Sequence, residues 1–316
     1  MPAVQTLRRV WVQNFYKEGD LLQWRTEAQG IPPSSAFVSS PYEPDAHDAK
    51  KHTTQWVGYK IHVTETCEED LPPLITQVES ATGPTADGAA TPTIHAHLQG
   101  KDLLPGLHLV DTGYLDGPLL AESRRDYGVE LYGPLRPNRH WQARAGEGFD
   151  AAHFAIDWER KQATCPAGKV SISWTPAIDN RTNEVIKVKF STKDCGVCPY
   201  RPKCFRSKKK YQRRMITIRP QEAYEALHAG RARENSAEFV ATYARRAGIE
   251  GTLSRCLRRC RLRRTRYIGL ARVHLAHVLT AVAINFLRLG EWLTGTPPAK
   301  TRHSAYARLM ADTVAA

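Results

Sequence analysis

The stretch LHLVDTGYLDG at residues 107–117 decides the class of fold that the sequence predicts. Its apolar run ends at Asp111, and a glycine-containing turn leads into a helical segment that extends to about residue 127. A strand, a turn and a helix in this order are typical of a parallel-sheet unit, and GVELYGPL at 128–135 supplies the next strand. Open α/β sheets place functional groups at the carboxyl ends of their strands, so Asp111 is a candidate site residue.

The rest of the pattern predicts a core of mixed strands and helices that is interrupted by an insertion. WVGYKIHVTET (56–66) and LITQVES (74–80) alternate in polarity and indicate two antiparallel strands, and a helix is expected at 89–99. After Pro220 the apolar residues again recur at the spacing of a helix. We therefore expect a residual N-terminal helix and linker at 1–50, the first part of the core at 51–137, and a β-rich insertion with a cysteine cluster at 138–217. A helical completion of the core is expected at 218–296, followed by a tail at 297–316. The helices of that completion are expected at 221–233, 237–260 and 271–293.

The charge balance favours a polyanionic partner. The chain carries 45 Lys and Arg against 32 Asp and Glu, for a net charge of +13. Two runs, RPKCFRSKKKYQRR (201–214) and RCLRRCRLRRTR (255–266), contain no acidic residue. Such runs suit phosphate contacts with nucleic acid, which release condensed counterions. The alternative is a basic protein whose charged runs are solvated faces.

The sequence predicts a protein of the reducing cytosol that does not enter a membrane. The most apolar stretch, 278–289, is short and contains Asn285 and Arg288, so it indicates a buried helix of a soluble domain. Seven cysteines, an odd number in a chain of this length, fit a reducing compartment better than a disulfide framework.

Four of the cysteines form a candidate zinc site. Cys195 and Cys198 are separated by two residues, Cys204 follows, and Cys165 precedes them by thirty positions. Tetrahedral Zn²⁺ takes four such thiolates, and a small β-rich insertion gains folding energy from a metal. The alternative is a set of thiols that bind no metal.

A second cluster of candidate residues lies in YARRAGIEGTLS at 243–254. Tyr243, Arg246 and Glu250 are spaced by three, four and seven positions, which places them on one face of a helix. Cleavage of a phosphodiester by divalent ions requires carboxylates that converge on one point, and Asp111 and Glu250 are candidates for two of them. Taken singly, Asp111 could be a turn former and Glu250 a solvated helix residue.

These motifs resemble the DDE-type transposases of insertion sequences, in the branch that has a cysteine-containing insertion between its second Asp and its Glu. VGYKIHVTET, LITQVES, HLVDTGYLD and the helical segment from Arg266 carry the resemblance, which extends from about Leu7 to Arg308. It implies an α/β fold with an RNase H-like mixed sheet flanked by helices. It also implies that Asp111 and Glu250 hold Mg²⁺ or Mn²⁺ and that Tyr243 and Arg246 contact DNA phosphates.

The sequence departs from the family pattern at two places. The signature continues to a lysine seven positions after the Glu, where this chain has Leu257, with Arg258 next to it as a substitute phosphate contact. The family's first catalytic Asp lies on an earlier strand, and no such strand is expected at 1–50, where Asp45 and Asp48 fall in an expected loop. We therefore expect that a longer N-terminal region is missing, and Asp45 is the weaker alternative.

The resulting hypothesis is a transposase catalytic domain, incomplete in this chain, that hydrolyses a phosphodiester at element ends and transfers the strand to target DNA. Double-stranded DNA and further copies of the chain are the expected partners, with Lys208, Lys209 and Lys210 of the insertion as additional DNA contacts. The expected location is the cytoplasm, in association with the nucleoid. Two alternatives stay open: a non-catalytic remnant that binds DNA or inhibits, and a zinc-containing DNA-binding regulator.

Overall fold

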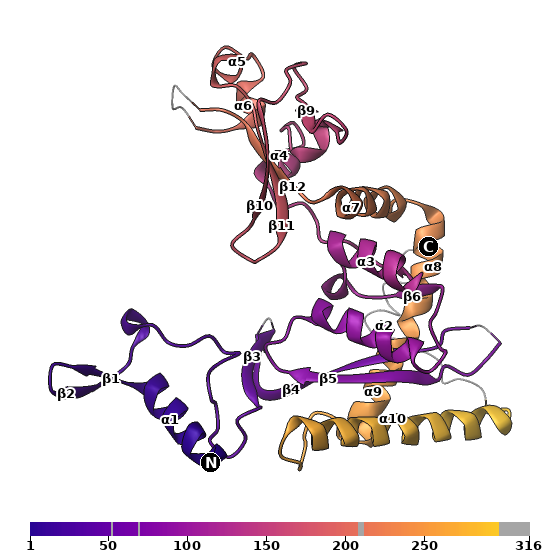
Figure 1. Ribbon diagram of the computed structural model, residues 1–316. Coiled ribbons are helices and arrows are strands. Elements are labelled where there is room, and N and C mark those ends of the chain that lie inside the picture. The colour runs from indigo at the N-terminus through magenta and orange to yellow at the C-terminus, as the bar shows by residue number, and fades with distance from the viewer. Residues whose placement is uncertain (52, 69, 208–211, 297–316) are drawn as a thin grey trace, which may run out of the picture.

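Figure 1 shows a mixed α/β fold in which a core of strands and helices carries an insertion that projects from one end. The computed structural model describes residues 1–51, 53–68, 70–207 and 212–296. The expected α/β class is confirmed, and the arrangement is consistent with the RNase H-like core that the resemblance implies.

The first sheet of the core is antiparallel. It contains β3 (His47–Lys51), β4 (Thr54–Glu65) and β5 (Ile75–Thr82), and β4 pairs with both of the others. The expected pair of antiparallel strands is thereby confirmed. Helix α2 (Thr91–Gln99) follows the 3₁₀ turn η2 (Asp87–Ala90) and packs on β5, as does α10 (Leu270–Leu293). The two helices lie on opposite sides of the sheet (Figure 1).

The second sheet is the parallel unit that the sequence predicts. It pairs β6 (Leu107–Leu109) with β7 (Glu130–Tyr132), and the connection passes through the turn η3 (Thr112–Tyr114) and helix α3 (Gly117–Tyr127). The Asp116 carboxylate caps α3 by accepting the N–H of Leu119 at 2.9 Å. Gly128, at φ +67°, ends the helix in the left-handed conformation that glycine adopts at low cost.

The insertion is rich in strands and has a core of its own. Phe154, Val188 and Phe190 are almost fully buried there, together with Ala163, Ile216 and Ile218. In chain order its elements are α4 (Trp141–Arg144), η4 (Ala151–His153), β8 (Ala155–Asp157), β9 (Gln162–Thr164), β10 (Ser173–Ile178), β11 (Glu184–Lys189), α5 (Thr192–Gly196), α6 (Arg201–Cys204) and β12 (Met215–Ile218).

The helical segment after the insertion is divided differently from the expectation. Helix α7 (Gln221–Glu234) is as expected, but the single helix expected at 237–260 is interrupted. It consists of α8 (Ala237–Ala244), the 3₁₀ turn η5 (Arg245–Ala247) and α9 (Gly248–Arg259). The Arg245 guanidinium donates to the carbonyl of Cys67 at 2.8 Å, a contact between distant segments that a helical pattern does not reveal.

Helix α10 is buried on one face only, so the expectation of a buried helix is wrong for the other face. Val273, His277 and Ile284 face the sheet, whereas Leu279 and Phe286 are 59% and 70% exposed. Among the helices of the described residues, α10 is the one that is long and apolar enough to cross a membrane. Its packing against β5 makes that weak evidence for a span.

The N-terminal region contains strands that the sequence pattern did not predict. Helix α1 (Pro2–Asn14) is followed by a hairpin of β1 (Phe15–Glu18) and β2 (Leu21–Trp24), and by the turn η1 (Glu27–Gln29). Asp48 lies on β3, so placing it in a loop was wrong, because HDAKK gains strand structure from pairing with β4 and not from its own polar sequence. Asp45 lies in a turn, as expected.

Candidate functional site

Asp111 lies just beyond β6, at the carboxyl end of the parallel unit. Its Oδ1 accepts the N–H of Thr112 at 2.8 Å and so caps the turn η3. The side chain is otherwise exposed, and it lines a cavity of about 490 Å³ between β4, α2, β6 and α9. Position at a strand end, exposure and a free carboxylate oxygen make Asp111 available to a cation or a phosphate-bound metal.

Tyr243, Arg246 and Glu250 lie next to one another on α8, η5 and α9. The Arg246 guanidinium lies 5.9 Å from the centre of the Tyr243 ring and 3.5 Å from Glu250 Oε1. Glu250 is two-thirds exposed, whereas Arg246 is three-quarters covered. The Arg246 side chain therefore lies between Tyr243 and Glu250, and it is itself part of the wall of the cavity.

The fold brings Asp111 to the same place as these three residues. Burial raises the pKa of the Tyr243 phenol, the Arg246 cation lowers it, and the carboxylates of Asp111 and Glu250 both raise it. Two acids separated by the whole insertion in sequence thus both lie near one phenol. Such a cluster combines anionic groups that can hold a metal with a cation that can bind a phosphate.

Tyr114 and His62 also belong to this region, although the sequence reasoning missed them. The Tyr114 hydroxyl lies 2.6 Å from His62 Nδ1, and burial, Asp87 and Asp111 raise the pKa of Tyr114. Tyr114 follows Asp111 by three positions in DTGY, a spacing that could have indicated it. His62 lies on β4 and meets Tyr114 only in the folded chain.

Three further carboxylates come from Asp87, Asp48 and Asp45, and Asp87 lies close enough to the site to raise the pKa of Tyr114. Asp87 forms an ion pair with Lys60 at 3.1 Å, and Asp48 accepts from the Gln55 amide at 2.9 Å. Burial and Glu43 raise the pKa of the Tyr59 phenol, and the negative charge of Asp45 raises it further. Within residues 1–51, 53–68, 70–207 and 212–296, no group of three or more His, Cys, Asp and Glu side chains is arranged to hold a metal ion.

The remaining DNA-contact candidates are only partly described. Arg258 is exposed near the end of α9, and its Nε donates to the carbonyl of Ser254 at 3.3 Å. Its charge therefore faces solvent on the helix that carries Glu250. Lys208, Lys209 and Lys210 lie outside the described residues.

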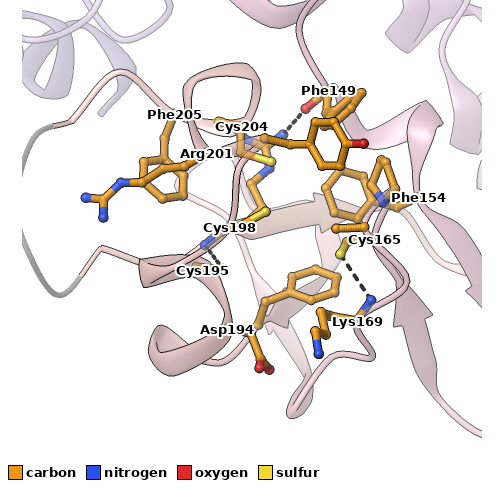
Figure 2. A pocket seen from close by; sticks show the side chains of 15 residues that line it. Phe149, Phe154, Cys165, Lys169, Asp194, Cys195, Cys198, Arg201, Cys204 and Phe205 are labelled. Carbon is orange, nitrogen blue, oxygen red and sulfur yellow. Dashed lines mark hydrogen bonds between the residues drawn. The ribbon is translucent and has the colours of Figure 1, made fainter.

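Cys165, Cys195, Cys198 and Cys204 meet around one cavity of about 30 Å³ in the insertion (Figure 2). The N–H of Lys169 donates to the Cys165 sulfur and that of Arg214 to the Cys195 sulfur, both at 3.4 Å. Burial raises the pKa of Cys195 and raises that of Cys204 to about 11. The expected convergence of the cysteines is observed, but the thiols are not arranged to hold a metal.

A parallel strand followed by Asp111, a Tyr-Arg-Glu cluster on late helices and a cysteine-containing insertion between them are the features on which the resemblance to DDE-type transposases rests. Residues 164–290 match the family model described as "Transposase DDE domain", which confirms the resemblance. The matched segment contains the cysteine cluster and Glu250, and Asp111 lies before it. Neither the curated proteins nor the solved structures give a match. The family match supports a transposase function, binding to DNA and the use of divalent metal ions.

Proposed function

We propose that this chain is the catalytic part of a DNA transposase that cleaves a phosphodiester at the ends of its element and joins the strand to target DNA. The observation that carries the proposal is that Asp111 and Arg246 line one cavity and that Arg246 lies 3.5 Å from Glu250 Oε1 and 5.9 Å from the centre of the Tyr243 ring. The net charge of +13 agrees with a DNA partner. The proposed location is the cytoplasm, on the nucleoid, where copies of the chain pair on two DNA ends.

Asp111 and Glu250 are the proposed ligands of Mg²⁺ or Mn²⁺. Their hard oxygen donors fit these ions, which protein sites often hold through one or two carboxylates together with water and substrate phosphates. When bound, the metal supplies an activated water and stabilises the leaving oxygen. Arg246 would hold the phosphate, with Tyr243 against it and Arg258 as a further contact along α9.

The alternative proposal is a remnant that binds DNA without cutting it. It is favoured by the observation that no third ligand joins Asp111 and Glu250 among the described residues. Two-ion catalysis depends on carboxylates that hold both metals, so a site with two carboxylates is expected to bind metal more weakly than a complete one.

The two proposals differ in Mn²⁺ binding and DNA cleavage. We expect Asp111→Asn and Glu250→Gln each to weaken Mn²⁺ binding at least ~10-fold, because each removes a charged oxygen donor. The measurement is electron paramagnetic resonance of free Mn²⁺, followed by nicking of supercoiled plasmid. The matched control is Glu222→Gln, an exposed carboxylate on α7 that pairs with Arg125. Unchanged Mn²⁺ binding in both site variants would contradict the proposed metal site and favour the alternative of a non-cutting DNA-binding remnant.

The cysteine cluster is proposed to bind structural Zn²⁺ after its thiol side chains rotate toward a common centre. Two amide N–H groups already donate to its sulfurs, which stabilises thiolates. A cavity of about 30 Å³ has room for one small ion. Because the pKa of Cys204 is about 11, binding must release protons, and the affinity should rise with pH.

We expect Co²⁺, used as a probe for Zn²⁺, to give thiolate charge-transfer absorption with the unaltered chain and to lose most of it with Cys198→Ser. Cys67→Ser is the control, because Cys67 lies outside the cluster. Equal absorption from Cys198→Ser and the unaltered chain would show that the cluster is not the metal site.

A further inference from the structure

The outer face of α10 carries a row of large apolar side chains that no element of the described residues covers. Helix α10 packs on β5 and forms the outermost layer on its side of the first sheet (Figure 1). The row, here called the α10 seam, contains Leu275, Leu279, Val282, Phe286 and Leu293, which are between 43% and 74% exposed. Contiguous exposed apolar patches mark interaction surfaces, so the seam calls for a partner.

The α10 seam has the spacing of a coiled coil. From Leu275 to Phe286 its members are separated by four, three and four positions, and Leu293 follows seven positions later. Alternation of three and four positions is the pattern by which the side chains of two helices interlock. The side of α10 that faces the sheet is a separate stripe, which includes the buried Val273 and Ile284. The helix therefore has two apolar stripes, and the described chain covers one of them.

The α10 seam is also symmetric from end to end. Leu275 and Phe286 are equidistant from the same midpoint as Leu279 and Val282. If two copies of the helix pack antiparallel about that midpoint, Leu275 of one copy lies opposite Phe286 of the other. Leu279 then lies opposite Val282. Every large side chain in the centre of the seam thus meets another large apolar side chain.

Charge favours the antiparallel direction, and small residues permit a close approach. Arg272 is exposed three positions before Leu275, at the start of the same stripe. In a parallel pair the two Arg272 side chains would lie opposite each other and repel. In an antiparallel pair each lies beside the last turn of the partner helix, whose carbonyl groups carry partial negative charge. Beside the seam, Ala276, Ala283 and Gly290 recur every seven positions, which allows helix axes ~8 Å apart.

We propose that a second copy of this chain covers the α10 seam, with the two α10 helices packed antiparallel about a two-fold axis. Such a contact uses the same surface on both copies, so it closes at a dimer. From Arg272 to Leu293 the contact is ~32 Å long, at the small end of stable interfaces, and we expect a dissociation constant of about 1–10 μM. The proposal deepens the proposed pairing of copies on DNA and rests on that function only for its purpose, because the contact itself needs no DNA.

Sedimentation equilibrium of the full chain without DNA tests the seam. We expect Leu279→Glu to raise the dissociation constant of the dimer about 100-fold or more, because the symmetry removes two buried leucines and places two carboxylates in the contact. Leu279 is exposed in the single chain, so the variant should fold, which circular dichroism checks. The matched control is Ile178→Glu on β10, since Ile178 and Leu279 are both 59% exposed. An equal loss from the control would contradict the assignment to α10.

A full chain that stays monomeric at ~100 μM would overturn the proposal. Binding of that monomer to phosphatidylcholine vesicles would then assign the seam to a membrane surface. Dimers that form only after residues 297–316 are removed would assign the seam to that segment. Because DNA is absent, none of these results bears on metal binding or DNA cleavage, and the two proposals fail separately.

A pair of charged variants tests the antiparallel direction. Leu279→Lys and Val282→Glu should each weaken the dimer when measured alone. In an equal mixture the antiparallel pairing places the new lysine opposite the new glutamate and leaves the other pair of Leu279 and Val282 unaltered. We expect the mixed dimer to be at least ~10-fold tighter than the dimer of either variant. A parallel pair would not bring the two positions together, so a mixture that shows no recovery would contradict the proposed arrangement.

Discussion

Replacing Arg288 with Met is expected to lower the free energy of unfolding by about 3–5 kcal/mol, because the change leaves a buried carboxylate without its partner. Arg288 Nη1 lies 2.9 Å from Glu65 Oε2 and 2.7 Å from the carbonyl of Pro73, and its Nη2 donates to Thr252. Thr252 in turn donates to Glu65 at 2.6 Å. The side chains of Arg288 and Glu65 are only 10% and 6% exposed. Urea unfolding followed by circular dichroism measures the loss.

A second ion pair, between α9 and α10, provides the control. Arg255 Nη1 of α9 lies 2.9 Å from Glu291 Oε2 of α10, but the two side chains are 29% and 39% exposed. Arg255→Met should therefore cost at most about 1 kcal/mol. The double variant Glu65→Gln, Arg288→Met should recover part of the loss, since it removes the unpaired charge. Equal losses from Arg288→Met and Arg255→Met would contradict the role assigned to the buried pair.

The second large effect is a loss of stability in mild acid that comes from buried histidines. Burial, together with a neighbouring histidine, lowers the pKa of His108 and of His277 from 6.5 to about 4. Between these values the unfolded chain binds more protons than the folded chain, so stability falls as the pH falls. The folded state has its full stability with respect to these histidines above pH 6.5, and it loses that stability progressively as the pH falls toward 4. Each histidine should remove about 2 kcal/mol between pH 7 and pH 5.

Unfolding curves at several pH values test this effect with a matched set of variants. His108→Gln and His277→Gln should each flatten the dependence of stability on pH, since glutamine does not titrate. His140→Gln should leave it unchanged, because His140 is exposed on the insertion. A slope that is unaffected by the first two substitutions would assign the acid sensitivity to other groups.

Local patterns predicted the elements whose structure depends on short-range sequence. LHLVDTG gave the strand and turn that place Asp111, and the alternation in WVGYKIHVTET gave β4. Contacts between distant segments were not predictable in this way. The 3₁₀ turn at Arg245–Ala247 and the pairing of HDAKK with β4 both depend on tertiary partners. The exposed face of α10 has the same apolar composition as its buried face, so composition alone could not distinguish them.

In the candidate site too, contacts within a short segment could be predicted and contacts between distant segments could not. The spacing of Tyr243, Arg246 and Glu250 predicted that they adjoin on one helical face. They do adjoin, although the single helix assumed for that prediction is interrupted at η5. Their approach to Asp111 was an expectation from family resemblance, since no local rule connects residues on either side of an insertion. The contact between Tyr114 and His62 went unnoticed because their spacing in sequence carries no signal.

Helix α7 links the insertion to the segment that holds Asp111. On one side Tyr224 meets Trp158 of the insertion, with ring centres 5.5 Å apart. On the other side Gly117, the first residue of α3, lies so close to Ala223 that an added Cβ would be 2.7 Å from its carbonyl oxygen. Because Ala223 and Tyr224 are neighbours in sequence, the insertion and the start of α3 pack against the same turn of α7. A side chain larger than hydrogen at position 117 would therefore push α3 away from the helix that also contacts the insertion.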